Sequence, residues 1–174
     1  MKPIFERERE LGLDVFFYSN SKLFSSSSHW PIDPCELSRI YELDNLFFPH
    51  PWSKKAWLEL SDCEGGYALV LLKDRGLDYV AFALWKINEL EGLAHLLKVL
   101  VVPDWRGKSL GTLFLKSSID YFVENGMLNF YLEVDESNDP AIKAYECLGF
   151  EKLHRTLNFY GSGRNAVKMG KFLE

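Results

Sequence analysis

Apolar side chains along this chain follow two periods. Alternating or continuous apolar runs predict strands at residues 67–72, 79–87, 94–102, 128–134, 150–159 and 166–172. Apolar positions that recur every three or four residues predict helices at 34–47, 54–60, 110–124 and 141–148. Three successive strands, a helical crossover and a final hairpin predict one α/β (α+β) domain. Its central sheet is expected to be mixed and mostly antiparallel, with helices on both faces.

The first 29 residues carry a weaker pattern. Residues 14–20 suit a strand, whereas residues 22–28 suit either a second strand or a flexible, serine-rich tether. We therefore expect an N-terminal extension at 1–29, without an assigned role, ahead of a single domain at 30–174.

Composition and charge exclude several classes of protein. Of the 174 residues, 47% are hydrophobic, which is typical of a globular chain and not of a disordered one. The formal net charge of −5 argues against nucleic acid as the main partner and favours a basic or amine-bearing substrate. The sequence shows no apolar signal segment and no membrane-spanning run. We expect a cytoplasmic protein, either a monomer or a homodimer.

Neither the cysteines nor the histidines indicate a metal site. The three cysteines lack C-x-x-C spacing, as expected in a reducing compartment, and the four histidines lie in different segments. We assign no histidine a catalytic role and expect no bound metal.

The clearest chemical signal lies where the strand at 94–102 passes into the helix at 110–124. Pro103 stops the strand, and a basic turn at 106–109 leads into the helix. Such a turn directs free backbone N–H groups and the positive end of a helix dipole at one point, which suits a phosphate. A nucleotide P-loop is excluded because Val102 stands where that motif needs glycine, and no G-x-G-x-x-G is present. A simple helix-capping turn with Ser109 near the N-cap is the alternative.

The turn resembles a known cofactor loop. Arg106-x-x-Ser109-x-Gly111 is similar to the pyrophosphate loop of the GNAT superfamily of N-acetyltransferases, [QR]-x-x-G-x-[GA], with serine where the family usually has glycine. Residues 131–150 resemble the later half of the GNAT pattern. The matching residues there are Leu132, Val134, Asn138, Ala141, Tyr145, Gly149 and Phe150.

Two further segments resemble one particular group within this superfamily. Residues 48–53 (FPHPWS) are similar to the F-P-x-P-W-S segment of the bacterial ribosomal-protein alanine N-acetyltransferase group, and residues 158–160 (NFY) to its N-Y-Y segment. The resemblance implies acetyl transfer from acetyl-coenzyme A to a primary amine, above all the N-terminal α-amino group of a protein or peptide. A small-molecule amine acetyltransferase and a non-catalytic acyl-coenzyme A-binding module are the alternatives.

The resemblance also implies roles for individual residues. Glu133 corresponds to the general base and Tyr145 to the general acid that protonates the leaving thiolate, whereas Asn138 would hold the pantetheine arm or the adenosine side. A backbone N–H at residues 99–101, near the end of the strand at 94–102, would stabilise the oxyanion of the tetrahedral intermediate. The coenzyme A-binding set comprises Val99, Leu100, Val101, Arg106, Gly107, Lys108, Ser109, Leu110, Gly111, Thr112 and Asn138.

These roles set one physical condition. An exposed glutamate with a pKa of about 4.3 is a weak base, so burial should raise the pKa of Glu133 if it deprotonates the amine. Apart from the family pattern, a solvated carboxylate on a strand is the better explanation of Glu133. Tyr145 is then equally well explained as a packed helix aromatic.

Overall fold

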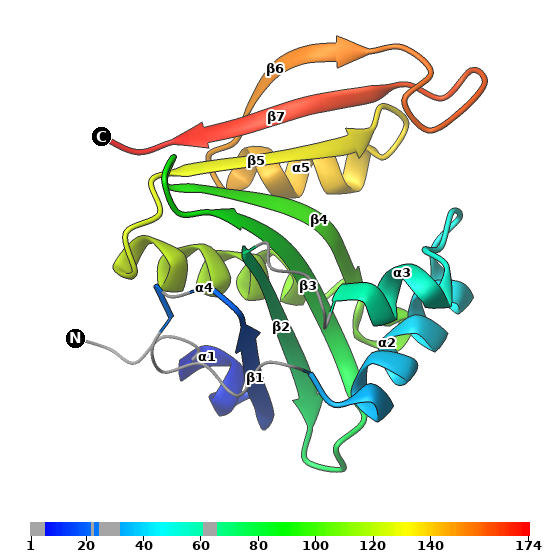
Figure 1. Ribbon diagram of the computed structural model, residues 1–174, viewed down its shortest axis with the longest axis vertical. Coiled ribbons are helices and arrows are strands. Elements are labelled where there is room, and N and C mark those ends of the chain that lie inside the picture. The colour runs from blue at the N-terminus through cyan, green and yellow to red at the C-terminus, as the bar shows by residue number, and fades with distance from the viewer. Residues whose placement is uncertain (1–5, 22, 25–31, 61–65) are drawn as a thin grey trace.

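The computed structural model describes residues 6–21, 23–24, 32–60 and 66–174. Within them the strands form one sheet in the order β1-β2-β3-β4-β5-β7-β6 (Figure 1). All neighbouring strands are antiparallel except β4 and β5, which confirms the expected mixed, mostly antiparallel sheet. The strands are β1 (Leu13–Ser19), β2 (Gly66–Asp74), β3 (Tyr79–Asn88), β4 (Leu93–Val101), β5 (Asn129–Asp135), β6 (Glu151–Thr156) and β7 (Ala166–Phe172).

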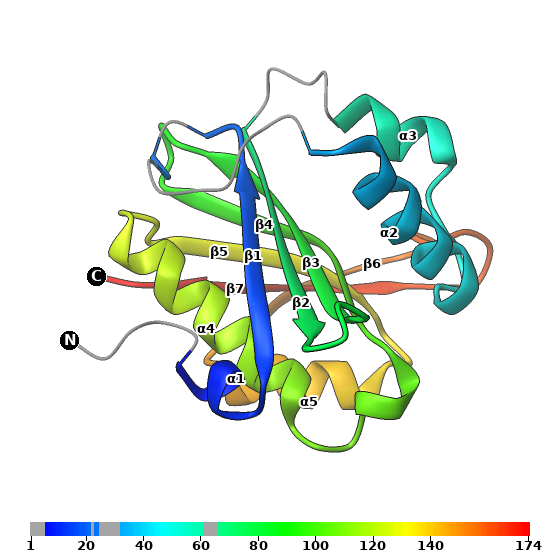
Figure 2. The same cartoon turned by 90° about the horizontal axis from the view of Figure 1, so that it is seen from below.

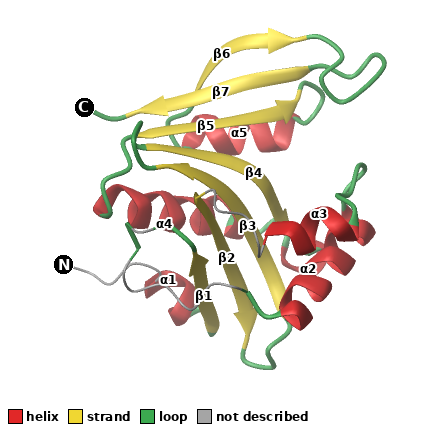
Figure 3. Cartoon of the chain, viewed as in Figure 1, coloured by secondary structure: helices red, strands yellow, loops and turns green. Residues whose placement is uncertain are grey.

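Helices cover both faces of the sheet, as expected. They are α1 (Glu6–Glu10), α2 (Pro34–Phe47), α3 (Lys54–Glu59), α4 (Leu110–Glu124) and α5 (Asp139–Cys147). Figure 2 shows α4 and α5 on one face and α2 and α3 on the other, and Figure 3 marks the helices against the strands. A short 3₁₀ helix at Pro103–Trp105, which the sequence did not predict, precedes α4.

The two faces divide the core into two layers. Along β2, Val70 packs in the layer beneath α4, whereas its neighbours Leu69 and Leu71 pack in the layer with Ile40 and Trp57 from α2 and α3. Because both faces are covered, the central strands are apolar on both sides, and this explains their continuous hydrophobic runs.

The described part of residues 1–29 contributes to this sheet. The strand expected at 14–20 is present as β1, which pairs with β2 along its whole length and forms one edge of the sheet. Leu13 and Phe24 are buried in the same core layer as α4. Most of the second strand or tether considered for residues 22–28 lies outside the described residues.

Strands β4 and β5 separate part-way along their length. Their parallel pairing joins only Leu93–Leu96 to Asn129–Leu132, although β4 continues to Val101 and β5 to Asp135. On its other side, the register of β4 with β3 shifts at Leu84/Trp85. Such a bulge bends a strand away from its neighbour. The two strands therefore diverge and leave a wedge between them, visible in Figure 1.

The last hairpin is shorter than the sequence predicted. Strand β6 ends at Thr156, whereas the apolar pattern extended it to residue 159. Asn158 adopts a positive φ of 54°, a conformation that ends an extended strand and starts the turn towards β7.

Candidate active site

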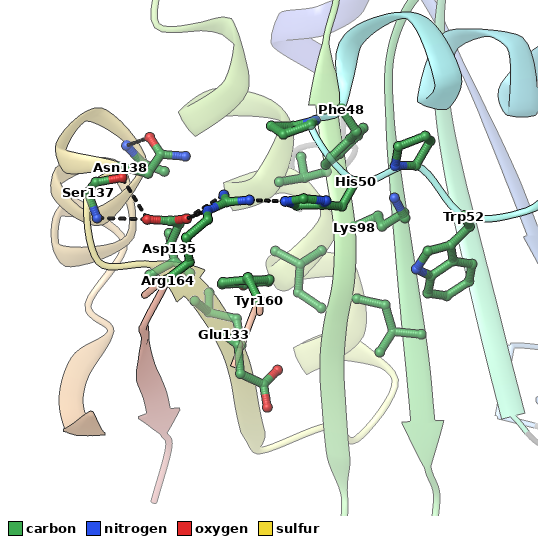
Figure 4. A pocket seen from close by; sticks show the side chains of 18 of the residues that line it. Phe48, His50, Trp52, Lys98, Glu133, Asp135, Ser137, Asn138, Tyr160 and Arg164 are labelled. Carbon is green, nitrogen blue, oxygen red and sulfur yellow. Dashed lines mark hydrogen bonds and ion pairs between the residues drawn. The ribbon is translucent and has the colours of Figure 1, made fainter. Parts of the chain in front are cut away.

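A cavity of about 800 Å³ lies in the wedge between β4 and β5. Its walls come from the α2–α3 connection at 48–52, from β4 at 96–99 and from β5 at 132–135. The start of α5 and the loop before β7 close the remaining sides (Figure 4). Residues from distant parts of the chain, between 48 and 164, thus meet where the two strands part.

Glu133 lies on β5 and lines this cavity. Its Oε2 is 2.7 Å from Nε2 of His95, which projects from β4, and its Oε1 is 4.0 Å from Nζ of Lys168 on β7. The side chain is only 14% exposed. The carboxylate is therefore held among a histidine and a lysine and is not the solvated edge group that the strand position alone allowed.

The electrostatic setting of Glu133 differs from the expectation. Burial raises the pKa of this carboxyl, but the hydrogen bond and charge of His95, the Tyr131 hydroxyl and the charge of Lys168 together outweigh it. The pKa of Glu133 is consequently lowered, so the expectation of a raised pKa was wrong: burial acts in the expected direction but is outweighed. Glu133 remains ionised at neutral pH and by itself is a weak proton acceptor.

Tyr145 projects from α5 into the same cavity. It is 7% exposed, and its ring packs edge-on against Phe150 with centroids 5.9 Å apart. Burial, followed by the neighbouring Tyr160, raises the pKa of the Tyr145 phenol well above its ordinary value. The phenol therefore keeps its proton at neutral pH, which is the state that a proton donor requires.

Asn138 both caps α5 and lines the cavity. Its side-chain oxygen accepts a hydrogen bond from the Ala141 backbone N–H at 3.3 Å and so caps α5, and the residue also lines the cavity. The next residue, Asp139, is the first residue of the helix.

The basic turn has the geometry of an anion site. Gly107 and Ser109 have positive φ angles of 74° and 56°, and Ser109 stands at the N-cap of α4 without a side-chain capping bond. Because an α-helix leaves its first N–H groups without intrahelical acceptors, those of Leu110, Gly111 and Thr112 face outward at the positive end of the dipole.

The basic side chains of the turn hold the loop itself. Arg106 Nε donates to the Val101 carbonyl at 2.7 Å, and Lys108 Nζ donates to the Asp104 carbonyl at 3.2 Å. A Cβ on Gly111 would lie 3.3 Å from Val101 Cγ2, so glycine allows α4 to approach β4 closely.

The structure brings only part of the expected site together. Val99, Glu133, Asn138 and Tyr145 line the cavity, whereas the turn at 106–112 lies beyond it at the start of α4. Leu100 is 5% exposed and points into the core layer shared with α2 and α3, so only its backbone is available to a ligand.

A buried ion pair at the cavity wall was missed by the sequence reading. Lys98 Nζ lies 2.6 Å from Asp44 Oδ1, and the two side chains are 5% and 0% exposed. Asp44 Oδ2 also accepts hydrogen bonds from the Trp52 backbone N–H and from Trp57 Nε1, both at 2.8 Å. Asp44 therefore ties the α2–α3 connection, which is one wall of the cavity, to β4.

The sequence held a signal for this pair. Asp44 continues the buried helical stripe of Leu37 and Ile40, and Lys98 interrupts the apolar run of β4. Burial lowers the pKa of the Lys98 ammonium, although its hydrogen bond to Asp44 and the charge of Asp44 oppose this effect.

A row of polar contacts crosses the cavity (Figure 4). Ser137 Oγ donates to Asp135 Oδ1 at 2.6 Å, Arg164 Nε donates to Asp135 Oδ2 at 3.0 Å, and Arg164 also contacts His50 from the opposite wall. The negative charge of Asp135 is thus compensated by Arg164.

Replacing Ser109 by glycine is expected to stabilise the protein by about 1 kcal/mol, because a left-handed conformation costs an L-residue with a Cβ about 1–2 kcal/mol. Urea denaturation monitored by circular dichroism measures the change in the free energy of unfolding. Ser162→Gly, in an exposed loop without a positive φ, is the matched control and should not stabilise. A Ser109→Gly midpoint at or below that of the wild type would contradict the strain argument.

No cluster of three or more histidine, cysteine or acidic side chains within the described ranges has the geometry of a metal site. None of the helices in that part of the chain is long and apolar enough to cross a membrane.

Comparison with known proteins places the chain among acetyltransferases. The model of the acetyltransferase (GNAT) family matches residues 37–150. The [ribosomal protein bS18]-alanine N-acetyltransferase of Haemophilus influenzae is 30% identical over 146 residues, covering 82% of this chain and 96% of that protein.

Solved structures give the same picture. The ribosomal-protein-S18-alanine N-acetyltransferase from Escherichia coli superposes with a TM-score of 0.73 at 27% identity, covering 82% of this chain and 91% of that chain. The spermidine N-acetyltransferase from Vibrio cholerae, solved in complex with CoA and spermine, gives a TM-score of 0.72 at 17% identity and covers 93% and 96%.

Proposed function

Because the chain belongs to the GNAT family of acetyltransferases, we propose that it acetylates the N-terminal α-amino group of a protein or peptide. It is an acetyl-coenzyme A-dependent N-acetyltransferase, and its acceptor is a primary amine. The observation that carries the proposal is the placement of Glu133 and Tyr145 in one cavity at the point where β4 and β5 separate.

The acetyl-coenzyme A site is proposed to extend from the turn at 106–112 to the wedge. The outward N–H groups of the first turn of α4 suit the diphosphate, and the Asn138 side chain suits the pantetheine arm. The residues present fit the co-substrate, because Gly107 and Ser109 take left-handed conformations that open the turn towards an anion. When bound, acetyl-coenzyme A supplies a thioester carbonyl that an amine can attack.

The chain supplies the groups that acetyl transfer requires. Beyond Leu96 the edge of β4 has no pairing with β5, so backbone N–H groups towards Val99 are proposed to face the developing oxyanion. Glu133 receives a proton from the attacking amine, and Tyr145 donates one to the departing thiolate sulfur. The acetyl C–N bond forms as the C–S bond breaks.

The charges around the cavity favour an α-amino group over a polyamine. Each of the two carboxylates among its described lining residues already has a cationic neighbour: Glu133 Oε1 lies 4.0 Å from Lys168 Nζ, and Asp135 pairs with Arg164. A polycationic acceptor therefore gains less attraction from these carboxylates than it would from unpaired ones. A peptide α-amino group, with a pKa of about 8, also loses its proton more readily than an alkylamine near 10.4.

A small-molecule amine is the second candidate acceptor. It is supported by the likeness in fold to the spermidine N-acetyltransferase from Vibrio cholerae. The third possibility, a non-catalytic acyl-coenzyme A-binding module, leaves the shared cavity position of Glu133 and Tyr145 without a purpose.

Thiol release from acetyl-coenzyme A, measured against two panels of acceptors, tests the proposal. One panel holds peptides that differ in the first residue, and the other holds spermidine, spermine and aminoglycosides. We expect turnover on peptides that start with alanine or serine, reduced at least tenfold in Glu133→Gln because general-base catalysis contributes about 10²-fold or more. Turnover on the small amines alone would show that the acceptor is a small-molecule amine and not a peptide. Tight binding of acetyl-coenzyme A without turnover would favour the non-catalytic module.

A further inference from the structure

His95 and Glu133 occupy adjacent strands on one face of the sheet. In the parallel register of β4 and β5, His95 lies beside Tyr131, two residues before Glu133. The imidazole is therefore a diagonal neighbour of the carboxylate, and its Nε2 lies 2.7 Å from Glu133 Oε2. The ring also packs edge-on against Tyr131, with centroids 4.9 Å apart, which fixes its orientation.

We propose that His95 is a positioning and proton-relay residue that acts through Glu133, so that the pair accepts the amine proton as one unit and releases it to solvent. This inference rests on the proposed acetyl-transfer function and deepens it. Glu133 borders the cavity that would hold the acceptor, whereas His95 acts on the acceptor only through Glu133. The sequence assigned His95 no role, because its proximity to Glu133 arises only when β4 and β5 pair.

The different exposure of the two side chains indicates a route for the proton from the cavity to solvent. Glu133 is 14% exposed and borders the cavity, whereas the His95 side chain is 26% exposed. A proton taken from an amine inside the cavity can therefore cross the Oε2–Nε2 contact and leave from the more exposed imidazole.

The proton balance of the step is simple. The ammonium form of the acceptor gives one proton to the pair of carboxylate and neutral imidazole, which becomes a pair of carboxylate and imidazolium. The neutral amine forms the new N–C bond and loses its second proton to solvent, while the C–S bond breaks and the sulfur takes a proton from Tyr145. Solvent reprotonates Tyr145 with an equivalent of that second proton, and the imidazolium returns its proton to solvent. The net products are the acetylated amine, the free thiol and one proton.

The relay compensates for the weak basicity of the Glu133 carboxylate. The lowered pKa of Glu133 means that the carboxylate by itself holds a proton poorly at neutral pH. The imidazole nitrogen at hydrogen-bond distance gives the carboxylate a second base to which the proton can pass.

Other charged and titratable groups face the pair. Tyr131 on β5 and Lys168 on β7 flank Glu133, and Tyr160 approaches it from the loop before β7. Lys86 on β3 is the register partner of His95. Neutral substitutions at His95 leave all four of these groups unchanged, and this isolates the contribution of the imidazole.

The test uses His95→Gln, which can still donate a hydrogen bond to Glu133 but does not titrate, and His95→Ala, which opens a space for free imidazole. His154→Gln, on the exposed strand β6, is the matched control. Turnover is measured from pH 5 to 9 with acetyl-coenzyme A and an alanine-starting peptide, or with spermidine if that is the amine acetylated. Thermal melting verifies that each variant is folded.

We expect kcat of His95→Gln to fall at least tenfold with little change in the KM for acetyl-coenzyme A, and the fall of kcat between pH 8 and 5 to flatten. Added imidazole should restore His95→Ala but not Glu133→Gln. A His95→Gln enzyme with the wild-type kcat and pH profile would overturn the relay, because a hydrogen bond alone would then suffice. That result leaves acetyl transfer intact, whereas a folded wild type inactive on both acceptor panels defeats the proposed function itself.

Discussion

Replacing Tyr145 by phenylalanine is expected to lower kcat about 10²- to 10⁴-fold while leaving the binding of acetyl-coenzyme A unchanged. The substitution removes a single hydroxyl from a side chain that is 7% exposed, and the phenyl ring can keep its edge-on contact with Phe150. Because burial raises the pKa of the phenol well above its ordinary value, the wild type should retain its proton donor throughout the neutral range. Steady-state kinetics of thiol release measures the loss, and isothermal titration calorimetry measures co-substrate binding.

Tyr41→Phe is the matched control for this prediction. Tyr41 packs against the core layer of α2 and α3 and does not line the cavity, so the same hydroxyl is removed without touching the site. Wild-type turnover in Tyr145→Phe would show that the leaving thiolate takes its proton from another source, and Tyr145 would lose its role as the acid.

Replacing Asp44 by alanine is expected to reduce the free energy of unfolding by about 3–5 kcal/mol. The change leaves the ammonium of Lys98, which is 5% exposed, buried without its carboxylate. It also removes the acceptor for the Trp52 backbone N–H and for Trp57 Nε1. Since a domain of this size is typically stable by about 5–15 kcal/mol, this loss is a large fraction of the total. Urea denaturation monitored by tryptophan fluorescence gives the value.

An exposed pair in the same chain provides the control. Lys116 and Asp120 on α4 are also 2.6 Å apart, but their side chains are 61% and 49% exposed. Asp120→Ala should therefore cost no more than about 1 kcal/mol. Equal effects of Asp44→Ala and Asp120→Ala would contradict the view that burial makes the Asp44–Lys98 pair critical. In the double variant Asp44→Leu/Lys98→Met, which removes both charges, much of the lost stability should return.

Local sequence patterns predicted the elements and the segments that carry the chemistry. The strand, basic turn and helix around residues 99–114 could be predicted because their signals are local. Pro103, the turn residues and the helical spacing of apolar positions each involve only neighbouring residues. The placement of Glu133 on a strand and Tyr145 on the next helix followed from the same short-range periods, and the structure has both.

Interactions across the fold were beyond such patterns. The Glu133–His95 contact joins residues 38 apart in sequence, and the Asp44–Lys98 pair joins residues 54 apart. Neither separation follows a helical or strand period. The lowered pKa of Glu133 depends on groups from three strands, so a prediction from its own segment had the wrong sign.

The sequence by itself determined the order of the main elements, the basic turn ahead of α4 and the family, because each depends on residue types at short fixed spacings. The tertiary structure decided where the cavity opens, since this depends on the short pairing of β4 with β5 and on the register shift opposite β3. It also decided that β1 closes one edge of the sheet and that His95 meets Glu133. These features arise from strand pairing, which brings together groups that no local period relates.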